Sequence, residues 1–174
     1  INGAYYARVP GGFYYYILAL LQAFSKEPLA VYVLLSSAVA AGFYAIYRTG
    51  QEAYSWIGAL AATGAYALSP GVLSSAKQIW NPVLTLPMTA FVFLLLIRVL
   101  RGNAWALPWL IGLLLATIQV HMSNLALLTA ILFVLVVFPH EARLKHWALA
   151  FLVALIVMAP YLIVEIANGF VNTE

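Results

Sequence analysis

The sequence predicts an all-α, polytopic transmembrane helical bundle, and three observations lead to this prediction. Of the 174 residues, 66% are hydrophobic and only 7% are charged, with a mean hydropathy of +0.99. A soluble domain carries charge on roughly a quarter of its residues, so this chain has too few charges to cover a surface in water. Long apolar runs also alternate with short polar segments. In lipid such runs must be helical, because every backbone amide needs an internal partner.

Six apolar runs are candidate membrane spans, since a spanning helix needs about 20 mainly apolar residues. The first begins at Pro28, which suits the first turn of a helix, and the second stops at Ser69, Pro70 and Gly71. The six ranges are 28–47, 53–68, 82–100, 104–120, 122–138 and 146–164.

Residues 12–24 form a shorter apolar run that carries three consecutive tyrosines, Tyr14, Tyr15 and Tyr16. Tyrosine prefers the headgroup level of a membrane, where both its ring and its hydroxyl group are satisfied. We therefore expect a helix that lies along the interface or dips into it. A seventh, slanted span is the alternative interpretation.

These segments predict one transmembrane domain, 1–174, that is a piece of a longer module. Residues 1–27 are expected to form an outer loop and the interfacial helix. Residues 28–164 form the six spans, and residues 165–174 form another outer loop. We expect more protein upstream, because the chain starts at Ile1 rather than at a methionine.

The basic residues predict the orientation of the chain. Short cytoplasmic loops carry an excess of lysine and arginine. If the N-terminal end is outside, five basic residues fall on the cytoplasmic side, and these are Arg48, Arg98, Arg101, Arg143 and Lys145. Only Arg8, Lys26 and Lys77 then fall outside. The longer and more polar loops lie on this outer side, so we expect function there.

His121 is the first candidate site residue, because it lies between two predicted spans and beside Gln119 and Ser123. Polar groups at this depth are costly and usually face a cavity. The alternative is a histidine in a tight turn, satisfied by a carbonyl group or by water.

Lys77 and Asn81 are candidates in the second outer loop. An exposed lysine can hold a phosphate as a point charge. It can equally extend to the interface beside Trp80, which would anchor the segment at the headgroup level. Asn81 precedes Pro82, so it is either a substrate ligand or the N-cap of the next span.

Arg8 and Glu165 complete the candidate set. Arg8 precedes Gly11 and Gly12, which either form an anion-binding backbone nest or give a flexible entry to the interfacial helix. Glu165 ends the last apolar run, close to a helix C-terminus, where a negative charge is disfavoured. Its position there therefore predicts a function.

Several segments, in order, resemble membrane glycosyltransferases of the GT-C type. The resemblance is closest to the bacterial relatives of dolichyl-phosphate-mannose protein mannosyltransferases and of lipid A aminoarabinose transferase. The matching segments are Pro10-Gly-Gly-Phe-Tyr-Tyr-Tyr16, Ser69-Pro70, Ile79-Trp-Asn-Pro82, Gln119-Val-His-Met-Ser123, Pro160-Tyr-Leu-Ile-Val-Glu165 and Asn168-Gly-Phe170.

The resemblance implies a transferase that moves a sugar from a polyprenyl-phosphate donor to an acceptor on the outer face of a bacterial inner membrane. It implies that Arg8 and Lys77 hold the donor phosphate and that His121 or Glu165 orients a substrate. It also implies a catalytic aspartate in the first outer loop. The chain contains no aspartate, so we expect this residue upstream of Ile1 and expect the segment alone to be inactive.

A second interpretation is a non-catalytic, structural subunit of a larger membrane complex, with partner membrane subunits. A transporter is less favoured, because no charged residue lies in the middle of a span. We expect no nucleic-acid partner at a net charge of +3. With no cysteine and no nucleotide-binding or metalloprotease motif, we expect no cofactor and no metal.

Overall fold

The fold was analysed in a computed structural model that describes residues 12–75 and 81–167. These residues form helices and the turns between them, and no strand occurs among them, so the all-α prediction is confirmed. The elements are α1 (Phe13–Phe24), α2 (Pro28–Ala53), α3 (Trp56–Leu68), α4 (Pro70–Ser75), the 3₁₀ helix η1 (Asn81–Leu84), α5 (Thr85–Leu100), α6 (Ala106–Val120), the 3₁₀ helix η2 (Met122–Asn124), α7 (Leu125–Val137) and α8 (Leu144–Ala167).

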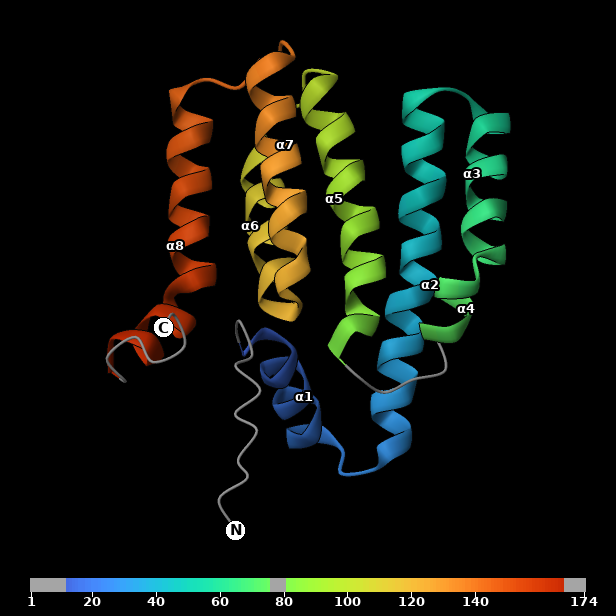
Figure 1. The fold of residues 1–174 in the computed structure, drawn as a ribbon, viewed down its shortest axis with the longest axis vertical. Helices are drawn as coiled ribbons and strands as arrows, with labels where there is room; N and C mark the ends of the chain where they lie inside the picture. Colours follow the sequence, from blue (N-terminus) through green and yellow to red (C-terminus); the bar gives the residue numbers. More distant parts are fainter. Residues whose placement is uncertain (1–11, 76–80, 168–174) are drawn as a thin grey trace.

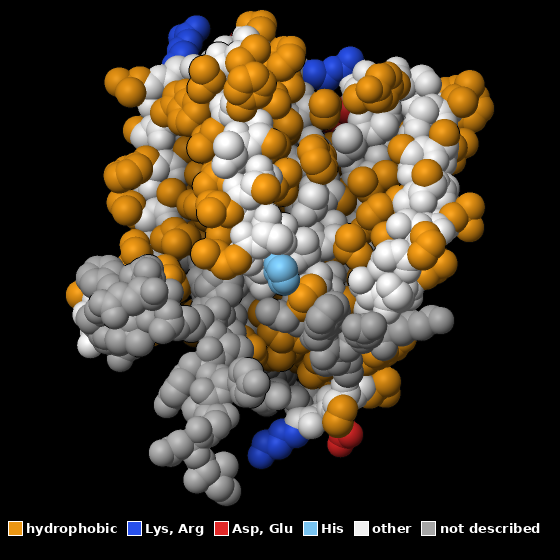
Figure 2. Space-filling view, in the orientation of Figure 1, with side chains coloured by type: hydrophobic (Ala, Val, Ile, Leu, Met, Phe, Trp, Pro, Cys, Tyr) orange, Lys and Arg blue, Asp and Glu red, His pale blue; other side chains and the backbone are white. Residues whose placement is uncertain are grey.

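The longer helices stand side by side, and successive ones run in opposite directions (Figure 1). The turns α2–α3, α5–α6 and α7–α8 lie at one end. We call this the basic end, because it carries Arg48, Arg98, Arg101, Arg143 and Lys145. We call the other end, with α1 and the α6–α7 turn, the tyrosine end. Figure 2 shows charged side chains at the two ends and a hydrophobic band between them, as expected for a protein embedded in lipid.

Three helices are long and apolar enough to cross a membrane, and they are Pro28–Ala53, Pro82–Leu100 and Leu144–Ala167. Helices α3, α6 and α7 have 13, 15 and 13 residues. At 1.5 Å per residue each is about 20 Å long, less than the hydrocarbon thickness of about 30 Å. Its three long, apolar helices therefore identify the chain as an integral membrane protein. The six-span topology stays a prediction.

Two segments expected to be loops are helical. Residues 48–52 form the end of α2, because Arg48 donates to Glu52 one turn later over 2.8 Å. A new helix, α3, then starts at Ser55, whose hydroxyl oxygen accepts the Gly58 N–H as an N-cap. The predicted loop 69–81 contains α4, which begins at Pro70, a residue preorganised for the first turn of a helix.

The interfacial helix is confirmed as a short helix, but its tyrosines differ from one another. Helix α1 lies across the tyrosine end, beneath α6 and α7 (Figure 1). Tyr14 is only 5% exposed and packs on Leu35 and Val120, whereas Tyr15 and Tyr16 are about half exposed. A helix has an inner and an outer face, so adjacent side chains differ in burial. The interfacial position of the three tyrosines stays a prediction.

Helices α5 and α6 form the centre of the bundle. Helix α2 packs on one side of α5, and α8 packs on the far side of α6. Helices α5, α6, α7 and α8 share a core of aliphatic side chains. Its members include Val99, Leu107, Leu110, Leu114 and Ile131. Lipid tails are as apolar as these side chains, so close packing rather than the hydrophobic effect holds such helices together.

Small residues allow α2 and α3 to approach each other closely. A Cβ atom placed on Gly50 of α2 would lie 2.6 Å from the Ala59 Cα atom of α3. Gly42 and Ala45 of α2 are also buried, but their neighbours include Pro87, Ala90 and Leu94 of α5. The more obvious small residues of α2 and α3, among them Ala40, Ala41, Ala61, Ala62 and Ala65, are exposed. Composition therefore identifies which helices can approach closely, but not which face makes the contact.

Candidate functional site

The described segments that carry predicted site residues lie at the tyrosine end. Asn81 begins η1 there, Gln119 and His121 lie around the end of α6, and Glu165 lies near the end of α8 (Figure 1). Three other candidates, Arg8, Lys77 and Trp80, lie outside the described residues, as does the side chain of Asn81. The described part of the candidate site is therefore the end of α6, the turn that follows it and the end of α8.

His121 occupies an exposed turn that the chain builds from its own polar groups. Helix α6 ends at Val120, and His121 has an extended backbone conformation that starts the short η2 helix. Its Nδ1 atom lies 2.7 Å from the Ser123 hydroxyl oxygen and accepts the Ser123 N–H over 3.3 Å. Because Nδ1 accepts the backbone proton, the proton of a neutral ring belongs on Nε2. His121 therefore presents an N–H donor outside the bundle.

Gln119 is not part of an open cleft. Its side chain is 2% exposed, and its Nε2 atom donates to the Val157 carbonyl oxygen of α8 over 2.9 Å. One turn away, Asn124 donates to the Thr117 carbonyl oxygen over 2.8 Å, which fastens the start of α7 to the end of α6. Buried amides need such partners in a membrane interior. The structure therefore gives Gln119 a contact that joins α6 to α8, and its substrate contact stays a prediction.

Glu165 lies in the most enclosed position of all the acidic residues that the structure describes. It is 1% exposed and follows Pro160 in α8. Helix α8 changes direction near its C-terminal end (Figure 1), as proline inside a helix causes. Ionisable groups at membrane depth are rare and usually functional. The burial of Glu165 therefore favours a role in positioning nearby groups over direct contact with a large substrate.

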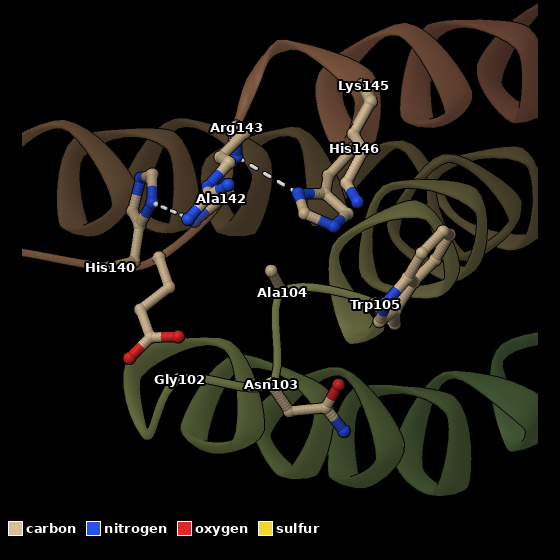
Figure 3. A pocket seen from close by; sticks show the side chains of 10 residues that line it. Gly102, Asn103, Ala104, Trp105, His140, Ala142, Arg143, Lys145 and His146 are labelled. Atoms are coloured by element: carbon tan, nitrogen blue, oxygen red, sulfur yellow. Dashed lines mark hydrogen bonds between the residues drawn. The ribbon is translucent and has the colours of Figure 1, made fainter.

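A second polar site lies at the basic end, and the sequence analysis did not predict it. Figure 3 shows a cleft between the α5–α6 turn and the start of α8, lined by Trp105, His140, Arg143, Lys145 and His146. From the sequence alone, the basic segment 143–146 indicates only orientation. The signal that could have identified the cleft is the recurrence of tryptophan beside basic residues, at Arg101 and Trp105 and again at Lys145 and Trp147, with His140 and His146 in the second segment.

Comparison of the chain with protein-family models, with curated proteins and with solved structures finds no match. Within residues 12–75 and 81–167, no group of three or more histidine, cysteine or acidic side chains could hold a metal ion.

Proposed function

We propose that the chain is part of a membrane glycosyltransferase that moves a sugar from a polyprenyl-phosphate donor to an acceptor on the outer face of the membrane. The observation that supports this proposal most strongly is the exposed His121–Ser123 turn. It lies at the same end of the bundle as the interfacial helix α1, within one of the segments that resemble the GT-C type.

The physical chemistry of a lipid-linked donor suits this end of the molecule. The polyprenyl chain lies in the bilayer, so its phosphate group lies at the headgroup level. Tyr15 and Tyr16 of α1 are about half exposed at this end, and tyrosine is enriched at membrane interfaces. The donor therefore reaches the His121 turn without leaving the membrane.

The proposed roles divide between charge and orientation. As the sugar leaves, negative charge builds on the donor phosphate, and fixed donors or cations stabilise it. In this proposal the N–H of His121 and the ammonium group of Lys77 serve that purpose. Buried Glu165 positions the end of α8, and an aspartate outside this segment acts as the base that activates the acceptor.

Transfer of a radiolabelled sugar from a polyprenyl-phosphate donor, measured in membranes that contain the intact protein, tests the proposal. Two variants, Lys77→Gln and His121→Ala, should each lower the rate about tenfold or more, because each removes a contact to developing charge. The matched control is Lys26→Gln, an exposed lysine at the same end, and it should change the rate less than twofold. Equal rates in all three variants would remove these residues from the site.

The role of Glu165 has its own pair of variants. Glu165→Gln keeps the shape of a buried side chain but removes its charge, whereas Glu27→Gln makes the same change at an exposed position. A loss of transfer in the first variant alone supports a positioning role. If melting temperature falls without any change in the rate per folded molecule, Glu165 has only a structural role.

The second candidate function is a non-catalytic subunit of a larger membrane complex, and the lack of any aspartate in the segment favours it. Purification of the intact protein in a mild detergent distinguishes the two candidates. Stoichiometric partner subunits, together with no sugar transfer, would favour the structural subunit over the transferase.

A further inference from the structure

The cleft at the basic end is open to the surface. It has a volume of about 690 Å³ and lies between the α5–α6 turn and the loop that leads into α8. One wall is the segment 102–105, in which Gly102 has a φ of +94° that favours glycine. The other wall is the segment 140–146 (Figure 3). All of its lining residues belong to the described chain.

The charge of the cleft favours an anion. Arg143 and Lys145 line it and are exposed, and Arg101 lines a smaller adjoining cleft. Glu141 is the only acidic residue on the described walls of these clefts. Its carboxylate lies beside Gly102, where a built Cβ atom would be 3.1 Å from Oε1. The walls of the two clefts therefore carry three cations and one carboxylate.

The two histidines add neutral donors to this charge. The Nδ1 atom of His146 accepts the Arg143 N–H over 3.0 Å, and the Nδ1 atom of His140 accepts the Ala142 N–H over 3.3 Å. In each neutral ring the remaining proton then belongs on Nε2, which becomes a donor. His146 is only 4% exposed as a residue and lines the cleft. Its Nε2–H can donate to an anion bound there.

Tryptophan side chains indicate that the cleft lies at the headgroup level. The ring of Trp105 meets the His146 ring edge-on with centroids 4.9 Å apart, and the Lys145 Nζ atom lies 5.3 Å from the Trp105 centroid. Trp56, Trp109 and Trp147 lie near the same ends of their helices. Tryptophan gathers at membrane interfaces, so the cleft opens where lipid headgroups are. The N-termini of α6 and α8 also lie there and favour negative charge.

We propose that this cleft binds the phosphate headgroup of an anionic lipid in the leaflet at the basic end. Arg143 and Lys145 pair with the phosphate, His146 donates its Nε2–H, and Trp105 lies along the lipid beside the ammonium group of Lys145. Basic clefts between helices on the cytoplasmic side are general sites for such headgroups. The site lies at the opposite end from the proposed transfer site and is independent of it.

Binding of short-chain lipids to the purified, full-length protein in a neutral detergent tests this site. Dihexanoyl-phosphatidylglycerol is the anionic probe, dihexanoyl-phosphatidylcholine the zwitterionic one, and inorganic phosphate the soluble anion. The anionic lipid should bind about tenfold more tightly than the zwitterionic lipid. If inorganic phosphate binds as tightly as the anionic lipid, the anion site stands and its ligand is a soluble phosphate.

Variants locate the binding. Arg143→Gln and Lys145→Gln should each weaken binding of the anionic lipid about fivefold, the usual contribution of one basic side chain near a membrane surface. Arg143→Lys should keep most of the affinity, because it keeps the charge. The matched control Lys26→Gln removes the same charge at the tyrosine end and should leave binding within about twofold.

Two results would overturn the proposal. One is equal weakening by Lys145→Gln and Lys26→Gln, which would show attraction by net charge alone. The other is equal affinity for the anionic and the zwitterionic lipid. Arg143 and Lys145 are both exposed, so their variants should fold normally, and unchanged melting temperatures check this.

Discussion

Replacing Glu52 with glutamine tests how α2 is joined to α5. The Glu52 carboxylate accepts from two arginines. Arg98 of α5 reaches it with Nη2 at 2.9 Å and with Nε at 3.1 Å, and Arg48 of α2 reaches it with Nη2 at 2.8 Å. The contact to Arg98 joins residues that are 46 positions apart. Two nitrogen atoms of Arg98 bind the two oxygen atoms of the carboxylate, which gives the contact a fixed geometry.

The magnitude follows from the partial exposure of the three side chains. Exposed ion pairs contribute about 0–1 kcal/mol, and removing one partner of a fully buried pair costs about 3–5 kcal/mol. The side chain of Glu52 is 19% exposed, and those of Arg48 and Arg98 are about one third exposed. We therefore expect Glu52→Gln to lower the free energy of unfolding by about 2 kcal/mol, between these limits. Part of this loss comes from repulsion between Arg48 and Arg98, whose positive charges would no longer share a carboxylate.

Equilibrium unfolding of the purified protein in mixed micelles, with increasing sodium dodecyl sulfate, measures the change. Glu141→Gln is the matched control, because Glu141 is an exposed acid at the same end. It should shift stability by less than about 0.5 kcal/mol. The double variant Glu52→Gln with Arg98→Gln should be less destabilised than the sum of the single variants, by about 1 kcal/mol. If Glu52→Gln and Glu141→Gln are equally stable, the ion pair does not join α2 to α5.

Two further predictions concern helix packing. Gln119→Leu should destabilise the protein by about 1–3 kcal/mol in the same assay, because the Val157 carbonyl oxygen loses a buried donor. An unchanged stability would show that this contact is dispensable. Gly50→Ala should be destabilising by about 1–3 kcal/mol, because its new Cβ atom would meet the backbone of Ala59. The control is Gly64→Ala, whose Cβ atom would meet nothing within 4 Å, and it should stabilise α3 by up to about 1 kcal/mol. If Gly50→Ala and Gly64→Ala change stability in the same direction, this account of the α2–α3 contact is refuted.

The helices themselves could be predicted because their signals are local. Pro28 begins α2 as expected, and Ser69 ends α3 as expected. Errors occurred where a local polar contact decided the boundary. Arg48 and Glu52 were expected in a loop, but their pairing along the helix extends α2 to Ala53. The sequence shows that these charges exist, but not that they point toward each other and toward Arg98.

The candidate site could be predicted only in part. The polar turn at His121 was recognised, because polar residues between two apolar runs stand out. The burial of Gln119 was missed, since its partner, the Val157 carbonyl oxygen of α8, lies 38 residues away. The cleft beside His146 was missed for a similar reason, because its two walls come from separate turns.

The sequence by itself determined that this protein is helical, that it belongs in a membrane and that five of its eight basic residues lie at one end. Those properties depend on which residues follow one another along the chain. The tertiary structure decided which face of each helix is buried. It turned Tyr14 and Gln119 inward and left Tyr15 and His121 outside. Helices such as α7 are apolar around their whole circumference, so only packing against neighbouring helices fixes their rotation.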